Sequence, residues 1–336
     1  MTTSQDEVKR VNTNSHRPNN LLMDHSLYPF LARSHLAGAF SVAQPQSGPA
    51  GLSAFAVLFL EHWEFEPPEG SLRDPRFVGE FGSFQPDYRS WSQREYGLRT
   101  GVFRVMQALQ QAGIRPAIAA NAMAVQRLPN LVAQFNEWGC EWLGHGLAAT
   151  RMMHSGQSLA EQRSHIEGAL EVLAQATGQR PRGWVSQDWG TTPDTPGLLA
   201  QAGISYTLDW VNDDQPSWMS PSAPGQRRLL SIPLSAEWDD VQCQWLRNME
   251  PGAHAQLAAA AFDRLADESQ AFRQPVVFGL ALHPWLCGMP SRVAALRGLL
   301  GQLRERADVR WTEPGALFDS FAPDAGNARG RPTLGP

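Results

Sequence analysis

Short apolar runs alternate with longer amphipathic segments through most of this chain, and this alternation restricts the possible folds more than any other feature. The runs with the length of buried strands are 54–60, 116–120, 141–143, 183–185, 205–208, 229–232, 276–282 and 309–311. The segments predicted to be helices are 100–112, 128–138, 159–177, 193–202, 252–269 and 291–307. Strands that alternate with helices form a mostly parallel sheet that helices cover. These runs favour a closed or nearly closed α/β barrel over an open sheet.

Glycine marks several of the predicted turns from helix to strand. Gly113, Gly139 and Gly203 each follow the end of a predicted helix and precede a predicted strand. Glycine accepts the left-handed backbone conformation that often ends a helix, so these positions support the predicted boundaries.

The two ends of the chain differ in composition from its middle. Residues 1–28 are polar and are predicted to form a flexible arm, and residues 323–336 are predicted to form a disordered tail. Residues 29–322 are predicted to form a single barrel domain. The segment 64–91 is rich in proline and glycine and follows the first strand. It is expected either to cover the barrel mouth as a lid or to make contacts between subunits.

Composition argues against several classes of protein. A hydrophobic content of 42% suffices for a large core in a chain of 336 residues. The formal charge of −5, without a dense Lys/Arg cluster, argues against nucleic acid as a partner. The polar N-terminus and the short apolar runs predict neither a secretory signal nor a membrane span. Because Cys140, Cys243 and Cys287 are scattered and odd in number, we expect reduced thiols and a cytoplasmic protein.

Three histidines, His62, His145 and His283, lie at the ends of apolar runs. A strand that ends on a titratable residue gains little from packing there. In an α/β barrel, however, the carboxyl ends of the strands form the rim that carries the chemistry. Glu61 adjoins the first histidine, and Trp285 lies two residues after the third. These positions predict an enzyme whose site is assembled from distant segments.

Several short segments occur in an order that is known from one superfamily. They are Leu60-Glu61-His62-Trp63, Tyr96-Gly97-Leu98-Arg99-Thr100-Gly101, Trp142-Leu143-Gly144-His145-Gly146, Arg180-Pro181-Arg182-Gly183-Trp184, Asp209-Trp210-Val211-Asn212-Asp213-Asp214-Gln215-Pro216 and Ala281-Leu282-His283-Pro284. In this order they resemble the polysaccharide deacetylase (NodB-homology) superfamily, and more narrowly its allantoinase-like and cyclic imide-hydrolysing branch. The resemblance runs from about residue 55 to about residue 321. It implies an α/β fold, a distorted TIM-like (β/α) barrel of the NodB-homology type.

The resemblance also implies a change at the metal site of the superfamily. Metal-dependent members carry a pair of aspartates in the first segment and two histidines four residues apart in a later one. This chain has Glu61-His62 in the first place, and Ala149 stands four residues after His145. A site without a metal cofactor is therefore favoured. The alternative is one divalent metal, zinc by the preference of imidazole, held by His62 and His145.

The resemblance assigns catalytic roles to three residues. Glu61 is the expected base that takes a proton from water, and His283 is the expected acid that protonates the leaving nitrogen. His145 is expected to orient the substrate or to polarise its carbonyl. The alternative interpretation of Glu61 and His62 is a solvated strand end.

Further positions are predicted to contact the substrate: His62, Trp184, Asp213, Asp240, Trp285 and Arg292. Trp184 is expected to stack on a planar ring, in a flat slot that Trp63, Trp210 and Trp285 complete. Asp213 lies in an acidic segment that is equally expected to cap a turn. Asp240 ends a Glu237-Trp238-Asp239-Asp240 tract that resembles one in relatives, and Arg292 either holds an anionic product or starts a helix.

The predicted function is hydrolysis of a non-peptide C–N bond in a small cyclic amide, imide or ureide, with allantoin the first named substrate and a cyclic imide the next. The expected partners are this small molecule and further copies of the chain in a homo-oligomer. One alternative is a metal-dependent carbohydrate N-deacetylase. A second is a non-catalytic binding protein on the same fold, since a fold does not fix a function.

Overall fold

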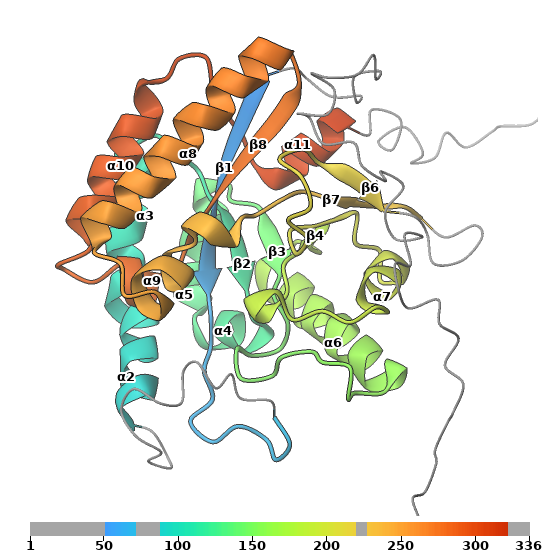
Figure 1. Ribbon diagram of the computed structural model, residues 1–336. Helices are drawn as coiled ribbons and strands as arrows, with labels where there is room; N and C mark the ends of the chain where they lie inside the picture. Colours follow the sequence, from blue (N-terminus) through green and yellow to red (C-terminus); the bar gives the residue numbers. More distant parts are fainter. Residues whose placement is uncertain (1–50, 72–87, 220–226, 322–336) are drawn as a thin grey trace, which may run out of the picture.

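A computed structural model describes residues 51–71, 88–219 and 227–321 of the chain (Figure 1). The predicted arm 1–28, the predicted tail 323–336 and the middle of the segment 64–91 lie outside the described residues. The division into an arm, one domain and a tail therefore stays a prediction. Within the described residues, no helix is both long and apolar enough to cross a membrane.

One curled sheet lies at the centre of the described structure (Figure 1). Its strands are β1 (Gly51–Leu60), β2 (Ala117–Ala120), β3 (Trp142–Gly144), β4 (Gly183–Trp184), β5 (Tyr206–Thr207), β6 (Ser217–Met219), β7 (Leu229–Ser231), β8 (Pro275–Leu282) and β9 (Arg310–Trp311). The order across the sheet is β6-β7-β5-β4-β3-β2-β1-β8, and β9 pairs with β1. The neighbouring strands are parallel except β6 and β7, which are antiparallel.

The two ends of this sheet approach each other without pairing as strands. The amide of Val277 in β8 donates a hydrogen bond to the carbonyl of Asp214, just before β6, over 2.9 Å. The sheet therefore curls into a half-barrel, and the predicted distorted α/β barrel is confirmed. The strand β6 was not predicted, whereas each of the other strands coincides with a predicted apolar run.

Helices cover the outside of the sheet (Figure 1). They are α2 (Tyr88–Tyr96), α3 (Val102–Gln111), α4 (Ala122–Arg127), α5 (Pro129–Trp138), α6 (Leu159–Thr177), α7 (Thr195–Gln201), α8 (Pro251–Phe272), α9 (Pro284–Cys287) and α10 (Val293–Glu305). The last helix, α11 (Pro314–Phe321), instead packs against the core inside the curl. The predicted glycine turns are confirmed, because Gly113, Gly139 and Gly203 have φ angles of 64°, 74° and 90°. The predicted helix 100–112 differs, because a π-helical turn at Gly97–Gly101 joins α2 to α3.

Alternate residues of β1 belong to two different hydrophobic cores, as the two-residue period of a strand requires. Ala56 and Leu58 pack toward the covering helices, in a core that also contains Phe262 of α8. Phe55, Val57 and Phe59 face the inside of the curl. Both faces of β1 are buried, which is why its sequence is continuously apolar rather than alternating. Glu61 follows Phe59 by two residues and so continues the inner row past the end of β1.

Candidate active site

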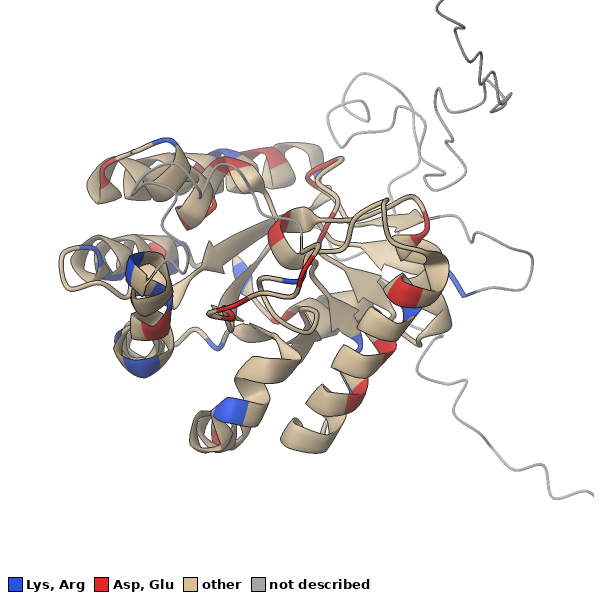
Figure 2. Ribbon diagram, turned by 90° about the horizontal axis from the view of Figure 1, so that it is seen from below, with Lys and Arg blue, Asp and Glu red and all other residues tan. Residues whose placement is uncertain are grey.

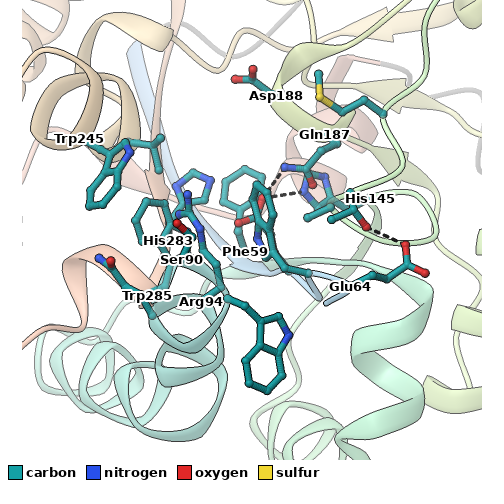
Figure 3. Close-up of a pocket in the computed structure, with 18 of the residues that line it drawn as sticks. Phe59, Glu64, Ser90, Arg94, His145, Gln187, Asp188, Trp245, His283 and Trp285 are labelled. Atoms are coloured by element: carbon teal, nitrogen blue, oxygen red, sulfur yellow. Dashed lines mark hydrogen bonds and ion pairs between the residues drawn. The ribbon is translucent and has the colours of Figure 1, made fainter. Parts of the chain in front are cut away.

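A cavity of about 190 Å³ lies at the carboxyl ends of β1, β3, β4 and β8 (Figure 3). Glu61, His145, Val185 and His283 follow these strands directly, and all four line the cavity. Much of the remaining wall is aromatic and consists of Phe59, Trp63, Phe65, Trp91, Trp189, Trp245 and Trp285. Polar and charged side chains complete the wall. A small cavity with aromatic walls and convergent polar groups is typical of a site for a small molecule.

Glu61 is a buried carboxylate held by its neighbours. The side-chain amide of Gln187 donates to its Oε1 over 2.6 Å, and His145 Nε2 lies 3.6 Å from the same oxygen. Burial alone would raise the pKa of Glu61, but His145, His283 and Gln187 together lower it to about 2. Glu61 is therefore an anion at neutral pH, as a base for water must be.

His145 is oriented by a backbone carbonyl. Its Nδ1 lies 2.7 Å from the carbonyl oxygen of Val185, an acceptor, so Nδ1 carries the hydrogen in the neutral ring. Nε2 consequently faces the cavity side and Glu61. This nitrogen is buried and has no hydrogen-bond partner among the described residues. It is thus available to a ligand in the cavity.

His283 is fixed by Asp240 through two contacts. Its backbone amide donates to Asp240 Oδ2 over 2.8 Å, and its Nδ1 lies 2.6 Å from Asp240 Oδ1. Burial alone would lower the pKa of His283, but the carboxylate of Asp240 raises it to about 9. The ring is therefore a cation at neutral pH. Asp240, which is fully buried and absent from the cavity wall, acts on the site through His283.

Phe59 lies between the two histidines (Figure 3). Its ring stacks on His283 with a centroid distance of 4.3 Å and meets the edge of His145 at 5.1 Å. The anionic Glu61, which lies beside His145, and the cationic His283 line the same cavity. Two titratable groups held in opposite charge states can serve as base and acid in one reaction.

Arg94 of α2 adds a buried positive charge to the wall. Its guanidinium carbon lies 3.3 Å from the ring centroid of Trp285 and 4.6 Å from that of Trp63 (Figure 3). Burial lowers the pKa of Arg94 to about 9, against the opposing influence of Glu61, so the group stays charged at neutral pH. Stacking on indole rings partly offsets the hydration free energy that a guanidinium loses on burial.

Asp239 is a second carboxyl in the cavity wall. It is 1% exposed, its Oδ1 accepts the backbone amide of Gln242 over 2.8 Å, and its Oδ2 lies 3.9 Å from His283 Nδ1. Burial, with Asp240 beside it, raises the pKa of this carboxyl. Sequence reasoning chose Asp240 from the same tract and missed Asp239, although the pairing of two adjacent aspartates was itself a usable signal.

Besides Asp240, four more of the residues predicted to contact substrate lie outside the cavity wall. His62 Nδ1 is held by the guanidinium of Arg127, and burial with this neighbouring charge lowers the pKa of the ring. Trp184 is fully buried, and its indole donates to Ser186. Asp213 accepts the amide of Asp214, which agrees with the turn interpretation. Arg292 lies at the N-cap position of α10, without a side-chain capping hydrogen bond.

The predicted set of slot tryptophans is therefore partly wrong. Trp63 and Trp285 line the cavity, but Trp184 and Trp210 pack against the core beside α6 and α7. Trp91, Trp189 and Trp245 take part in the wall instead. Trp91 and Trp245 belong to helical segments beside the rim, whose approach to the cavity depends on packing rather than on strand ends.

The described residues do not fit the alternative zinc site. His62 faces a guanidinium cation, and His145 uses Nδ1 for Val185, so the two rings do not converge with a third ligand. The one group of three ligand atoms among the described residues is Asp239, Asp240 and His283. Within it, His283 Nδ1 and Asp240 Oδ1 are separated by 2.6 Å, the spacing of a hydrogen bond. Two ligands of a tetrahedral zinc lie roughly 3.4 Å apart.

Charged side chains do not gather by sign on the face that Figure 2 shows. Acidic and basic residues both occur on the peripheral helices there. On α8 and its neighbourhood, for example, Arg306 pairs with Asp267 and Asp308.

Comparisons with known proteins agree with this architecture, although no family model matches the chain. The structure is similar to PuuE allantoinase, with 25% identity and a TM-score of 0.72, over 84% of this chain and 94% of that one. It is also similar to a probable polysaccharide deacetylase from Pseudomonas aeruginosa PAO1, with 25% identity and a TM-score of 0.71, over 82% of this chain and 92% of that one. A Schizosaccharomyces pombe protein whose name provisionally classes it as a polysaccharide deacetylase is 25% identical over 234 residues, which are 64% of this chain and 70% of that protein.

The shared fold extends over the strands that carry the cavity. Glu61, His145 and His283 stand at the ends of β1, β3 and β8, where the resemblance of the sequence had placed them. On the likeness of sequence and of structure together, the chain belongs to the polysaccharide deacetylase (NodB, CE4) superfamily.

Proposed function

We propose that this protein hydrolyses a non-peptide C–N bond of a small cyclic amide, imide or ureide. The observation that carries the proposal is an anionic Glu61 and a cationic His283 in the wall of one cavity. Amide hydrolysis needs a base for the attacking water, positive charge for the oxyanion and a proton for the departing nitrogen. The cavity wall offers a side chain for each of these needs.

In the proposed reaction, Glu61 accepts a proton from water while the water oxygen bonds to the ring carbonyl carbon. The guanidinium of Arg94 stabilises the negative charge on the carbonyl oxygen, and His145 orients the substrate. The C–N bond then breaks, and the electron pair on nitrogen takes a proton from His283. The product is an open chain with a new carboxyl group and an N–H group. Solvent removes the proton from Glu61 and restores the one on His283.

A ring substrate is supported by the size and the walls of the cavity. A volume of about 190 Å³ suits a small molecule, and flat aromatic side chains suit a planar ring. The similarity to an allantoinase points the same way. The names of two similar proteins favour carbohydrate N-deacetylation as the second candidate. Against it, Ala149 lines the cavity where metal-dependent members carry a second histidine.

The test is a comparison of turnover under one set of conditions. Allantoin, succinimide and dihydrouracil are assayed against chitin oligomers and acetylated xylan, each with and without added zinc. We expect hydrolysis of at least one ring amide and none of the oligomers. Activity on the oligomers with none on any ring would overturn the proposal in favour of deacetylation.

A further inference from the structure

We infer that Asp239 is the group that recognises substrate, by accepting a hydrogen bond from a ring N–H, and that the enzyme therefore selects rings with an unsubstituted nitrogen. The inference rests on the proposed function and narrows it to imides, hydantoins and related rings that keep an N–H. It gives Asp239 a role distinct from that of its neighbour Asp240.

The geometry separates the two aspartates. Both oxygens of Asp240 are used by His283, one by the backbone amide and one by the ring. Asp239 uses only Oδ1, which accepts the amide of Gln242 over 2.8 Å. Its Oδ2 is buried and has no hydrogen-bond partner among the described residues, and Asp239 lines the cavity. The ring of His283 does not satisfy this oxygen, because Nδ1 is 3.9 Å away and already bonded to Asp240.

A buried carboxylate oxygen without a donor is rare, because its lost hydration has to be replaced. A ligand N–H would replace it. The same wall holds two indole N–H groups without partners among the described residues, those of Trp189 and Trp285. The unmet acceptor of Asp239 and the two unmet indole donors complement a ring in which an N–H adjoins carbonyl groups, the arrangement found in imides and ureides.

The test requires a pH at which the carboxyl group of Asp239 is ionised. Burial raises the pKa of this carboxyl, and the charged groups that face it are His283, Asp240 and Glu61. A protonated carboxyl would donate from Oδ2 instead of accepting. Assays are therefore run at about pH 8.5, where a carboxyl with a raised pKa is still ionised.

The decisive variant is Asp239→Asn. Because the amide of Gln242 fixes an acceptor at the Oδ1 position, the asparagine must turn its NH₂ group toward the place of Oδ2. The variant thus keeps the shape and replaces an acceptor by a donor. Its matched control is Asp267→Asn, in which the aspartate side chain is 69% exposed on α8. Asp240→Asn serves as a comparison that acts through His283.

The substrates are succinimide with N-methylsuccinimide, and hydantoin with 1,3-dimethylhydantoin. We expect the wild type and Asp267→Asn to prefer the N–H ring in kcat/KM. For Asp239→Asn, we expect kcat/KM on the N–H ring to fall roughly 10- to 100-fold. The value on the methylated ring should change little, so that the preference for the N–H ring disappears. In Asp240→Asn, both forms should lose activity alike and the preference should remain.

Binding of the same four compounds is followed by tryptophan fluorescence, since several tryptophans line the cavity. If the wild type hydrolyses both forms of a ring equally well, or if Asp239→Asn keeps the wild-type preference, the inference on Asp239 is wrong while the proposed function stands. If the wild type neither binds nor hydrolyses an N–H ring, the inference on Asp239 and the proposed function are both wrong.

Discussion

Glu61 is the residue whose loss should reduce activity most at unchanged fold. Glu61→Gln keeps the shape and the contact with Gln187 but removes the proton acceptor. Loss of a positioned base typically lowers the rate ~10²- to 10⁴-fold. We expect a fall of this size in kcat on the best ring substrate. The control is Glu167→Gln, whose side chain is 53% exposed. Turnover near that of the wild type, with an unchanged pH profile, would remove Glu61 from the mechanism.

His283 should give the alkaline limb of the pH profile. Asp240 raises its pKa to about 9, so the imidazolium that donates a proton to nitrogen is lost as the pH rises through that value. We expect kcat/KM to fall there. In Asp240→Asn the cause of the raised pKa is removed, and the fall should move to lower pH. A limb that stays in place in this variant would contradict the assignment of His283 as the acid.

At the scale of elements, the contact between the π-helical turn and α9 is the feature most open to a test. A Cβ on Gly101 would collide with the backbone of Pro284, next to His283. We expect Gly101→Ala to lower stability by ~1–3 kcal/mol, as overpacking does, and to lower kcat by displacing α9. Gly301→Ala in α10 is the control, since nothing lies within 4 Å of its Cβ position. It should stabilise by ~0.5–1 kcal/mol. Thermal unfolding and turnover of both variants test these expected changes in stability and in kcat.

A strand or helix could be predicted from the sequence where its own residues carry a pattern such as an apolar run. The apolar run of β8 is long and uninterrupted, and His283 at its end could be placed because a strand end has a fixed position in a barrel. The strand β6 is three residues long, begins with Ser217 and pairs antiparallel, so it has no apolar run to reveal it. The π-helical turn and the position of Arg94 in the cavity wall depend on packing between segments far apart in the chain, which no local pattern contains.

At the scale of the whole molecule, the two charged groups of the cavity link stability to pH. The pKa of Glu61 falls from 4.5 to about 2 on folding, so its contribution is present above pH 4.5 and is lost as the pH falls toward 2. The pKa of His283 rises from 6.5 to about 9, so its contribution is present below pH 6.5 and is lost as the pH rises through 9. The contribution of these two groups to the free energy of unfolding is therefore greatest between pH 4.5 and pH 6.5.

The test is urea unfolding of the wild type and of Glu61→Gln across this range of pH. The variant cannot lose a carboxylate on acidification, so its free energy of unfolding should decline less between pH 4.5 and about 2. On the alkaline side the decline of the variant should end at a lower pH, because Glu61 helps to raise the pKa of His283. Parallel curves on the acid side would show that Glu61 is not ionised in the folded protein below pH 4.5.

The pairing of β1 with β8 has a consequence for the timing of biosynthesis. β1 is made early and is apolar on both faces, but its longest partner begins only at Pro275. At ordinary rates of translation, β1 waits roughly 10–40 s on the ribosome before β8 emerges. During that interval one edge of the strand can pair with another chain. A ribosome that stalls before residue 275 would therefore release a polypeptide poised to aggregate, and rapid translation or a chaperone that shields β1 should raise the yield of folded protein.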